Sequence, residues 1–347
     1  MAKRKNKNDD HYTGQMGLFD IFDEPQYDIP EHPSIKDFIV DAPKPAKPVE
    51  KDENPLDDQL PSSGKHSDRD ALLFMSFGSG SSGNCSFIGS LSDGGFLIDA
   101  GVDSSLVAES LFRIGMTMDR IRGICLTHDH SDHVRFIYSF VRKYPHLKIY
   151  CTPKVLNGIL RRHNISRRIK DYHKPIYKEF PFAIDKLANF EITAFEVSHD
   201  GTDNCGFFIR SLSGSFALAT DLGCITPRVD YYMRKANHVM IESNYDLKML
   251  RDGTYPAYLK ARIAADNGHL DNEITAAYLK EILTGRLATI FLCHLSQDNN
   301  RPEIAAKAVM ESLGTHDEIL QGRLPIPRVI VLPRFGSTEL FTLRINE

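Results

Sequence analysis

The chain of 347 residues lacks a long hydrophobic run, and no apolar stretch approaches the roughly 18 residues that a transmembrane helix requires. Its first ten residues, MAKRKNKNDD, are not followed by the apolar core of a secretory signal peptide. CxxC spacing is also absent, and the six cysteines stand mostly in apolar runs, which indicates reduced thiols rather than disulfides or a zinc ribbon. We therefore expect a cytoplasmic protein without membrane contact.

The sequence also lacks an excess of positive charge. The formal net charge of -4 and the pI near 6.4 exclude a global basic field, so any binding of nucleic acid requires a local basic patch. A chain of this length can bury a substantial core. The composition is therefore compatible with an enzyme.

Residues 1–70 differ in character from the rest of the chain. This leader is rich in Lys, Asp, Glu and Pro and shows no sustained periodicity, so we predict that it is disordered. From Ala71 onward, strand-like apolar runs alternate with helix-like segments, which predicts an α/β catalytic domain over residues 71–347. In DHVRFIYSFVRKY, apolar residues at i, i+3, i+4 and i+7 predict a helix that packs one face on a sheet.

A dense group of histidines follows the apolar run GICLTH. The segment LTHDHSDHV contains four potential metal ligands within six positions: His128, His130, Asp132 and His133. Strand ends in layered α/β folds project side chains into one crevice, and imidazole and carboxylate are ligands of catalytic Zn²⁺ and Mn²⁺ sites. A polar loop that merely contains three histidines is the alternative, but the density of the pattern favours a metal site.

The segment THDHSDH resembles the HxHxDH signature of the metallo-β-lactamase fold, an αββα sandwich whose hydrolases hold two metals in a shared groove. The resemblance implies that this chain binds two divalent metal ions, Zn²⁺ or Mn²⁺. It assigns one metal to His128, His130, His199 and Asp221, and the other to Asp132, His133, Asp221 and His294. Asp99, in LIDAG, matches an aspartate that supports the metal loop without binding a metal.

Elementary chemistry agrees with this division of ligands. Two neighbouring cations repel each other, so they need a negative bridge such as the carboxylate of Asp221. A metal lowers the pKa of bound water towards ~7, which makes a metal-bridging hydroxide the expected nucleophile and hydrolysis the expected reaction. Taken singly, His199 or Asp221 could have an ordinary structural role, and a metal-binding protein without turnover is a further alternative.

The segments NGHLDNE and CHLSQDNN resemble the nucleic-acid-processing phosphodiesterases of this superfamily, and the chain from about Leu72 resembles its YycJ-like or WalJ-like exonuclease branch. The resemblance implies a DNA 5′-exonuclease of repair in which His269 donates a proton to the leaving oxygen. Asp132 and His269 are thus the candidate catalytic residues, although His269 could instead orient a metal ligand. A hydrolase of a small phosphodiester or other small ester is the alternative. Asp271 departs from the branch's pattern and could raise the pKa of His269 or repel phosphate.

Three segments suit a polyanionic substrate. The loop GSGSSGN, with Ser81, Ser82 and Asn84, could cradle a phosphate or could be an ordinary hairpin turn. YLKAR carries Lys260 and Arg262, and RRHNISRRIK is a local basic run. These basic residues could contact phosphates or could form solvated helix faces.

An isolated apolar cluster, QMGLF, interrupts the polar leader. It resembles the pentapeptide with which bacterial replication and repair proteins bind the sliding clamp, with Met16 in place of Leu. The resemblance implies that Leu18 and Phe19 enter an apolar pocket of the clamp while Gln15 forms hydrogen bonds at its rim. Such tethering raises the effective concentration of an enzyme at DNA. Alternatively, the segment folds back onto the domain.

Overall fold

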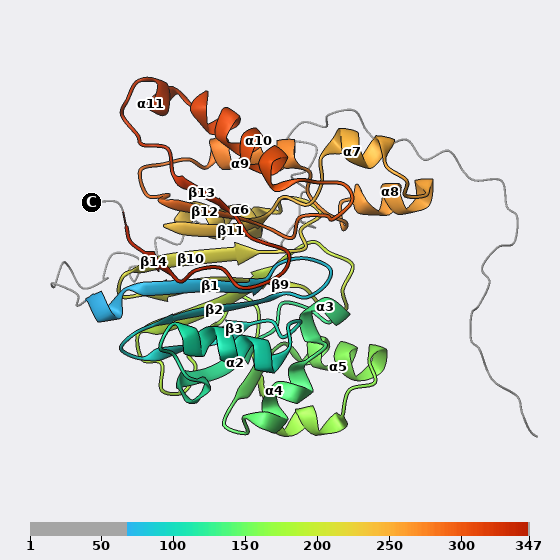
Figure 1. The fold of residues 1–347 in the computed structure, drawn as a ribbon, viewed down its shortest axis with the longest axis vertical. Coiled ribbons are helices and arrows are strands. Elements are labelled where there is room, and N and C mark those ends of the chain that lie inside the picture. The colour runs from blue at the N-terminus through green and yellow to red at the C-terminus, as the bar shows by residue number, and fades with distance from the viewer. Residues whose placement is uncertain (1–67, 346–347) are drawn as a thin grey trace, which may run out of the picture.

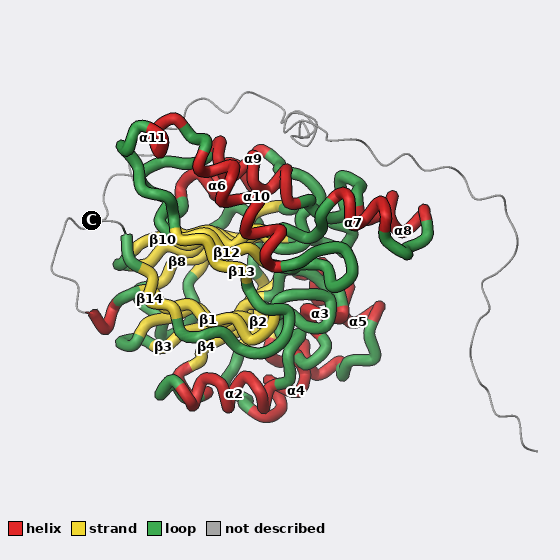
Figure 2. Tube along the Cα trace, turned by 45° about the horizontal axis from the view of Figure 1, so that its top comes forward, coloured by secondary structure: helices red, strands yellow, loops and turns green. Residues whose placement is uncertain are grey.

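The structure is a computed structural model that describes residues 68–345. The predicted disordered leader, with its clamp-binding segment at residues 15–19, lies outside these residues and stays a prediction. Two seven-stranded sheets face each other, and helices cover both outer faces (Figures 1 and 2). This arrangement is the αββα sandwich that the resemblance of THDHSDH implies.

The first sheet has the strand order β14 (Phe341–Leu343), β1 (Leu72–Gly78), β2 (Cys85–Ser90), β3 (Gly94–Ile98), β4 (Ile121–Cys125), β5 (Lys148–Cys151) and β6 (His173–Pro175). The second sheet has the order β13 (Arg328–Val331), β12 (Thr289–Cys293), β11 (His238–Glu242), β10 (Gly214–Ala219), β9 (Cys205–Ser211), β8 (Phe190–Glu196) and β7 (Pro181–Phe182).

The helices form two outer layers. The first sheet is covered by α2 (Ser104–Arg113), α3 (Ser131–Val134), α4 (Ile137–Lys143) and α5 (Pro153–Arg162). The second sheet is covered by α6 (Pro227–Lys235), α9 (Asn272–Glu281) and α10 (Pro302–Gly314). The remaining helices are α7 (Leu247–Asp252), α8 (Ala257–Ile263) and α11 (Asp317–Leu320), with short 3₁₀ turns η1 (Asp68–Asp70), η2 (Met118–Arg120) and η3 (Arg167–Tyr172).

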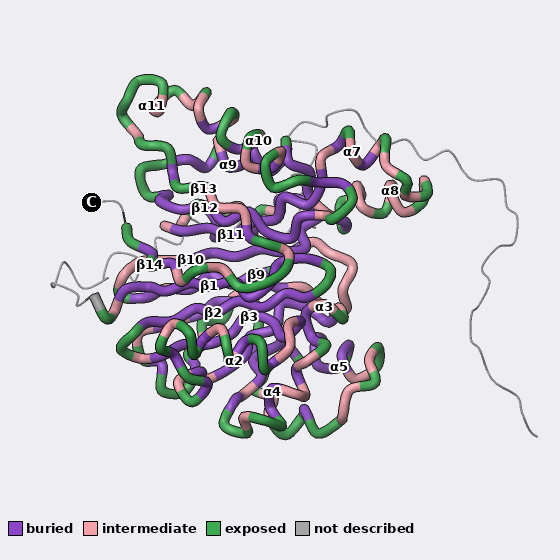
Figure 3. Tube along the Cα trace, viewed as in Figure 1, coloured by how far each residue is buried: buried purple, intermediate pink, exposed green. Residues whose placement is uncertain are grey.

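The central strands are buried on both faces because each sheet lies between a helical layer and the other sheet (Figure 3). Along β1, Leu72 and Phe74 face the second sheet, whereas Leu73 and Met75 face the helices. Phe74 packs on Phe291 with ring centroids 4.5 Å apart. Full burial of each such side chain contributes about 1.5–3 kcal/mol. These contacts hold the two sheets together.

The helix predicted within DHVRFIYSFVRKY is two helices, α3 and α4. The chain breaks between them because the N–H of Phe136 donates to the carbonyl of Ala100, 2.9 Å away, instead of continuing a helical ladder. The N–H of Ala100 in turn donates to the carbonyl of His133 at 2.7 Å. Apolar periodicity could not reveal these contacts with a loop some thirty residues earlier in the chain.

The parallel strands determine where functional side chains gather. Strands β3, β4 and β5 run parallel to one another, as do β10, β11, β12 and β13. Their carboxyl ends therefore meet at one end of the sandwich, which is the usual location of ligand-binding loops. Figure 1 shows α3, α5, α7 and α8 at this end. Among the helices of residues 68–345, none has the length and apolar character needed to span a bilayer.

Replacing His238 with Leu should reduce the sensitivity of the fold to acid. His238 is buried at the start of β11, and neither ring nitrogen has a hydrogen-bond partner within residues 68–345. Burial lowers the pKa of His238 to about 4 from its ordinary 6.5. Protons therefore bind the unfolded chain first as the pH falls below about 6.5, and this residue alone costs roughly 2 kcal/mol of stability between about pH 7 and pH 5.

Urea unfolding of the wild type and His238→Leu at these two pH values measures the effect. Contributions of the other histidines cancel in the comparison. Equal losses of stability in both proteins on acidification would contradict the assignment.

Candidate metal centre

The seven predicted ligand side chains come together where the two sheets meet at the carboxyl ends of their strands. His128 and His130 lie in the loop after β4, and Asp132 and His133 begin α3. The other three follow strands of the second sheet: His199 after β8, Asp221 after β10 and His294 after β12. A pocket of about 290 Å³ opens over them, lined by His130, Asp132, His199, Asp221 and His294 among others.

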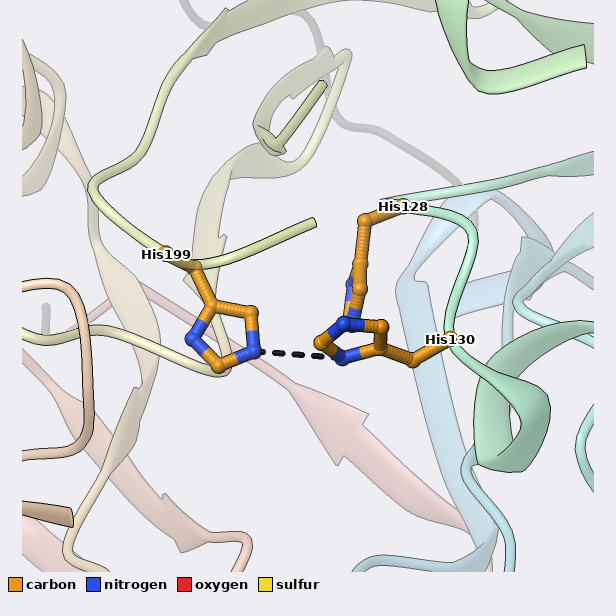
Figure 4. Close-up of side chains that lie close together, drawn as sticks. All are labelled: His128, His130 and His199. Carbon is orange, nitrogen blue, oxygen red and sulfur yellow. Dashed lines mark hydrogen bonds between the residues drawn. The ribbon is translucent and has the colours of Figure 1, made fainter. Parts of the chain in front are cut away.

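The first group of potential ligands is His128, His130 and His199, whose ligand nitrogens all lie within 4.8 Å of one another (Figure 4). His199 Nε2 lies 3.3 Å from His130 Nδ1. The other ring nitrogens face oxygens, since His199 Nδ1 lies 3.1 Å from the Gly268 carbonyl and His130 Nε2 lies 3.3 Å from Asp200 Oδ1. If those outer nitrogens carry the protons, two lone pairs face each other, and a cation between them satisfies both.

His128 gives a second indication that this group fits a metal. Its Nδ1 lies 3.0 Å from the hydroxyl of Thr127, whereas its Nε2 is buried without a hydrogen-bond partner among residues 68–345. Buried polar atoms are almost always paired. An unpaired nitrogen beside two other imidazoles therefore suits metal coordination.

The second group consists of Asp132, His133 and His294. Asp132 Oδ2 lies 3.5 Å from His133 Nε2 and 3.8 Å from His294 Nε2. His294 Nε2 is, like His128 Nε2, buried without a hydrogen-bond partner in the described part of the chain. Three donors thus converge from α3 and the end of β12.

Asp221 faces both groups. Its Oδ1 lies 3.7 Å from His199 Nε2, and its Oδ2 lies 3.1 Å from His133 Nε2. Burial by itself raises the pKa of this carboxyl, but His294 and His133 outweigh burial and hold the pKa well below its usual range. An ionised carboxylate with one oxygen toward each group suits the bridge between two cations.

Asp99 contacts two residues of the metal-binding segment, Thr127 and His133. Its Oδ2 lies 2.8 Å from His133 Nδ1, and its Oδ1 accepts a hydrogen bond from the Thr127 N–H at 2.8 Å. This contact leaves His133 Nε2 directed at Asp132 and Asp221. Carboxylate partners of this kind orient metal-binding histidines in many proteins.

Glu242, at the end of β11, is an organising residue that sequence reasoning missed. Its Oε1 lies 2.7 Å from His294 Nδ1 and 2.8 Å from His269 Nδ1. Its Oε2 accepts hydrogen bonds from the N–H groups of Leu222 at 2.8 Å and Leu270 at 3.3 Å. Although Asp221, Glu242, His269 and His294 also lie close enough to hold an ion, both oxygens of Glu242 are already engaged. It therefore positions two histidines.

The electrostatics of Glu242 agree with that role. Burial by itself raises the pKa of this fully buried carboxyl, but His269 and His294 together lower it to about 2. The sequence offered one indication that Glu242 is unusual, because this carboxylate ends the mostly apolar strand-like run HVMIE. The sequence could not predict that β11 pairs with β12 so that Glu242 lies beside Cys293, the neighbour of His294.

Comparison with known proteins agrees with a metal site at this position. The family model described as a beta-lactamase superfamily domain matches residues 95–290. The chain belongs to this superfamily. It is a metal-dependent hydrolase of the metallo-β-lactamase fold, and the fold and family expected from THDHSDH are confirmed. Membership implies that divalent metal binds, and the two ligand groups described above fit such ions.

Two curated relatives and one solved structure illustrate the similarity. The chain is 34% identical over 246 residues to exodeoxyribonuclease YycJ of Bacillus anthracis, which covers 70% of this chain and 89% of that protein. It is 32% identical over 242 residues to exodeoxyribonuclease WalJ of Streptococcus pneumoniae, covering 69% and 87%. The metallo-β-lactamase fold protein YhfI of Bacillus subtilis has a TM-score of 0.53 at 15% identity, covering 77% of this chain and 99% of that one.

The residues predicted to contact phosphate do not all lie in one place. Ser81 and Arg262 line the pocket over the metal centre, and Arg262 Nη2 also donates to Asp200 Oδ2 at 2.6 Å. Ser82 instead lines a separate hollow. Lys260 Nζ donates to the Arg251 carbonyl at 2.7 Å.

Two further residues have structural contacts of their own. Asn84 is buried, and its Nδ2 donates to Asp132 Oδ2 at 3.1 Å, so it positions a predicted ligand. Asp271, the departure noted beside His269, caps α9 by accepting a hydrogen bond from the Ile274 N–H at 2.8 Å.

Replacing Glu242 with Gln should lower metal affinity or kcat/KM by about 10–100-fold, the usual effect of losing a partner behind metal-binding histidines. Glutamine keeps the size of the side chain, but its NH₂ group cannot accept hydrogen bonds as Oε1 and Oε2 do. Metal content after dialysis and initial rates with a phosphodiester measure the effect. Glu281→Gln, on the exposed face of α9, is the control. Indistinguishable metal content and rates in the two variants would show that Glu242 positions nothing essential.

Proposed function

We propose that this hydrolase is a two-metal phosphodiesterase that degrades DNA from its 5′ end, as in repair. The observation that carries the proposal is the His269–Glu242 pair: His269 lines the same pocket as members of both ligand groups, and its contact with Glu242 suits a proton donor. Hydrolysis of a phosphodiester needs such a donor, since the leaving alkoxide is strongly basic. The names of the YycJ and WalJ relatives support DNA as the substrate.

The residues fit two divalent cations, Zn²⁺ or Mn²⁺. One would be held by His128, His130, His199 and Asp221, and the other by Asp132, His133, Asp221 and His294. When bound, such metals stabilise the negative charge that develops on phosphoryl oxygens and lower the pKa of water, which makes hydroxide available near neutral pH.

The protein's own groups supply the remaining functions. His269 Nδ1 is held at 2.8 Å by Glu242 Oε1, which leaves Nε2 to present a proton to the leaving oxygen. The carboxyl of Glu242 is ionised at neutral pH, because His269 and His294 hold its pKa at about 2. Arg262 and Ser81 line the same pocket, which supports contacts from these residues to the scissile phosphate.

A substrate panel tests this proposal. Metal-supplemented protein is incubated with 5′- or 3′-end-labelled single-stranded and duplex DNA, with RNA, and with a chromogenic phosphodiester. We expect release of mononucleotides from the 5′ end of DNA, loss of activity with a chelator, and no activity in His130→Ala. Cleavage of the chromogenic ester alone would instead identify a hydrolase of small phosphodiesters.

His269→Asn should have an effect that depends on the leaving group. On DNA, loss of the proton donor should lower kcat by about 10²–10⁴-fold. On a phosphodiester with a nitrophenolate leaving group, which departs without a proton, kcat should change little. Equal losses on both substrates would show that His269 orients a metal ligand rather than donating a proton.

A further inference from the structure

A further hollow, of about 430 Å³, is lined by residues of α5 and η3 and by Thr202. All charged side chains that line it are positive: Lys154, Arg161, Arg167 and Lys170. The protein as a whole is acidic, with a formal net charge of -4. This concentration of cations is therefore a local feature, and it accounts for part of the basic run RRHNISRRIK.

The geometry of α5 produces half of this surface. Lys154 and Arg161 lie seven residues apart on one face of the helix, whereas Val155 and Ile159 on the opposite face are buried against the first sheet. Arg167 and Lys170 approach from η3. All four cationic side chains are exposed, and within residues 68–345 the structure pairs none of them with a carboxylate. Four like charges without a counter-charge attract a polyanion.

The hollow is joined to the metal centre through Thr202 and Asp129. Thr202 lines the hollow, and it follows His199 by three residues, a distance of at most about 11 Å along an extended chain. Its hydroxyl donates to Asp129 Oδ2 at 2.6 Å, and its N–H donates to Asp129 Oδ1 at 2.8 Å. Asp129 stands between His128 and His130, so Thr202, in the wall of the hollow, is hydrogen-bonded to the metal-binding loop.

Helix α5 is anchored to the same loop. Arg162 Nε lies 3.4 Å from Asp129 Oδ2, and His163 Nε2 lies 2.6 Å from the Asp129 carbonyl. Gly158 permits this approach, because a Cβ added there would lie only 2.1 Å from Asp129 Oδ2. The basic face of α5 therefore has a defined position relative to His128 and His130.

We propose that this basic hollow binds the sugar–phosphate backbone of the nucleic-acid strand whose end is hydrolysed at the metal centre. The inference rests on the proposed function. Contacts between cations and phosphates are independent of sequence and position the strand. The four cations line a hollow separate from the pocket over the metal centre, so a strand reaches them only where it extends beyond the cleaved bond. The hollow therefore contributes to affinity for longer strands and not to the chemistry at the cleaved bond.

The test compares Arg161→Gln/Arg167→Gln with the control Lys307→Gln/Arg323→Gln, which removes two exposed cations at other positions. Binding to fluorescent single-stranded DNA of 4 and 20 nucleotides, with phosphorothioate linkages that resist cleavage, is measured by anisotropy at several salt concentrations. We expect the hollow variant to bind the 20-mer about tenfold more weakly, with the slope of log K against log salt reduced by roughly 1.4 for two lost contacts. Its kcat on a chromogenic phosphodiester should equal that of the wild type.

Two results would overturn the inference: a 20-mer affinity and salt slope in the hollow variant equal to those of the control, or wild-type protein that binds the 4-mer as tightly as the 20-mer. Cleavage of unmodified DNA by the wild type is measured in parallel. Absence of that cleavage contradicts the proposed function, whereas normal cleavage with unchanged binding in the hollow variant contradicts the role of the hollow alone.

Discussion

Three buried carboxylates at strand ends, those of Asp99, Asp221 and Glu242, impose the main constraint on this molecule. An ionised group loses several kcal/mol of solvation when it is buried, so it persists only with paired charges and hydrogen bonds. Here the imidazoles of His133, His269 and His294 contact these carboxylates directly. Backbone N–H groups add further hydrogen bonds to Asp99 and Glu242. Carboxylate oxygens and ring nitrogens therefore face one another across the site, an arrangement that suits divalent cations.

The backbone at these strand ends is strained. Asp99, Asp221 and His294 have φ values of 62°, 53° and 55°, in the left-handed region that non-glycine residues rarely occupy. Each such residue costs of order 1–3 kcal/mol. Hydrogen bonds to distant parts of the chain oppose this cost: the His294 N–H donates to the Ser79 hydroxyl at 3.0 Å, and the Asp99 N–H donates to the Cys125 carbonyl at 2.8 Å. The sandwich thus uses part of its packing energy to turn these side chains into the groove.

The separation along the chain between contacting residues explains which parts of the site could be predicted. His128, His130, Asp132 and His133 lie within one loop and helix start, so their spacing alone indicated metal binding. Glu242 contacts His269 and His294, which are 27 and 52 residues away. A carboxylate at the end of the mostly apolar run HVMIE was visible in the sequence, but the histidines that it contacts were not. The contact between Asn84 and Asp132, which are 48 residues apart, depends in the same way on the tertiary structure.

The sequence by itself determined the alternation of strands and helices and the residue types available for metal binding, because periodicity and local spacing depend only on neighbouring residues. The αββα class followed from the resemblance of THDHSDH to a family signature. Only the tertiary structure decided which oxygen faces which nitrogen, that Glu242 serves two histidines, and that Lys154 and Lys170 join Arg161 and Arg167 in one hollow. The physical reason is that these relations arise from strand order and from the packing of α5 on the first sheet. Strand order and helix packing bring together groups that are far apart along the chain, and the sequence does not show that these groups are close in space.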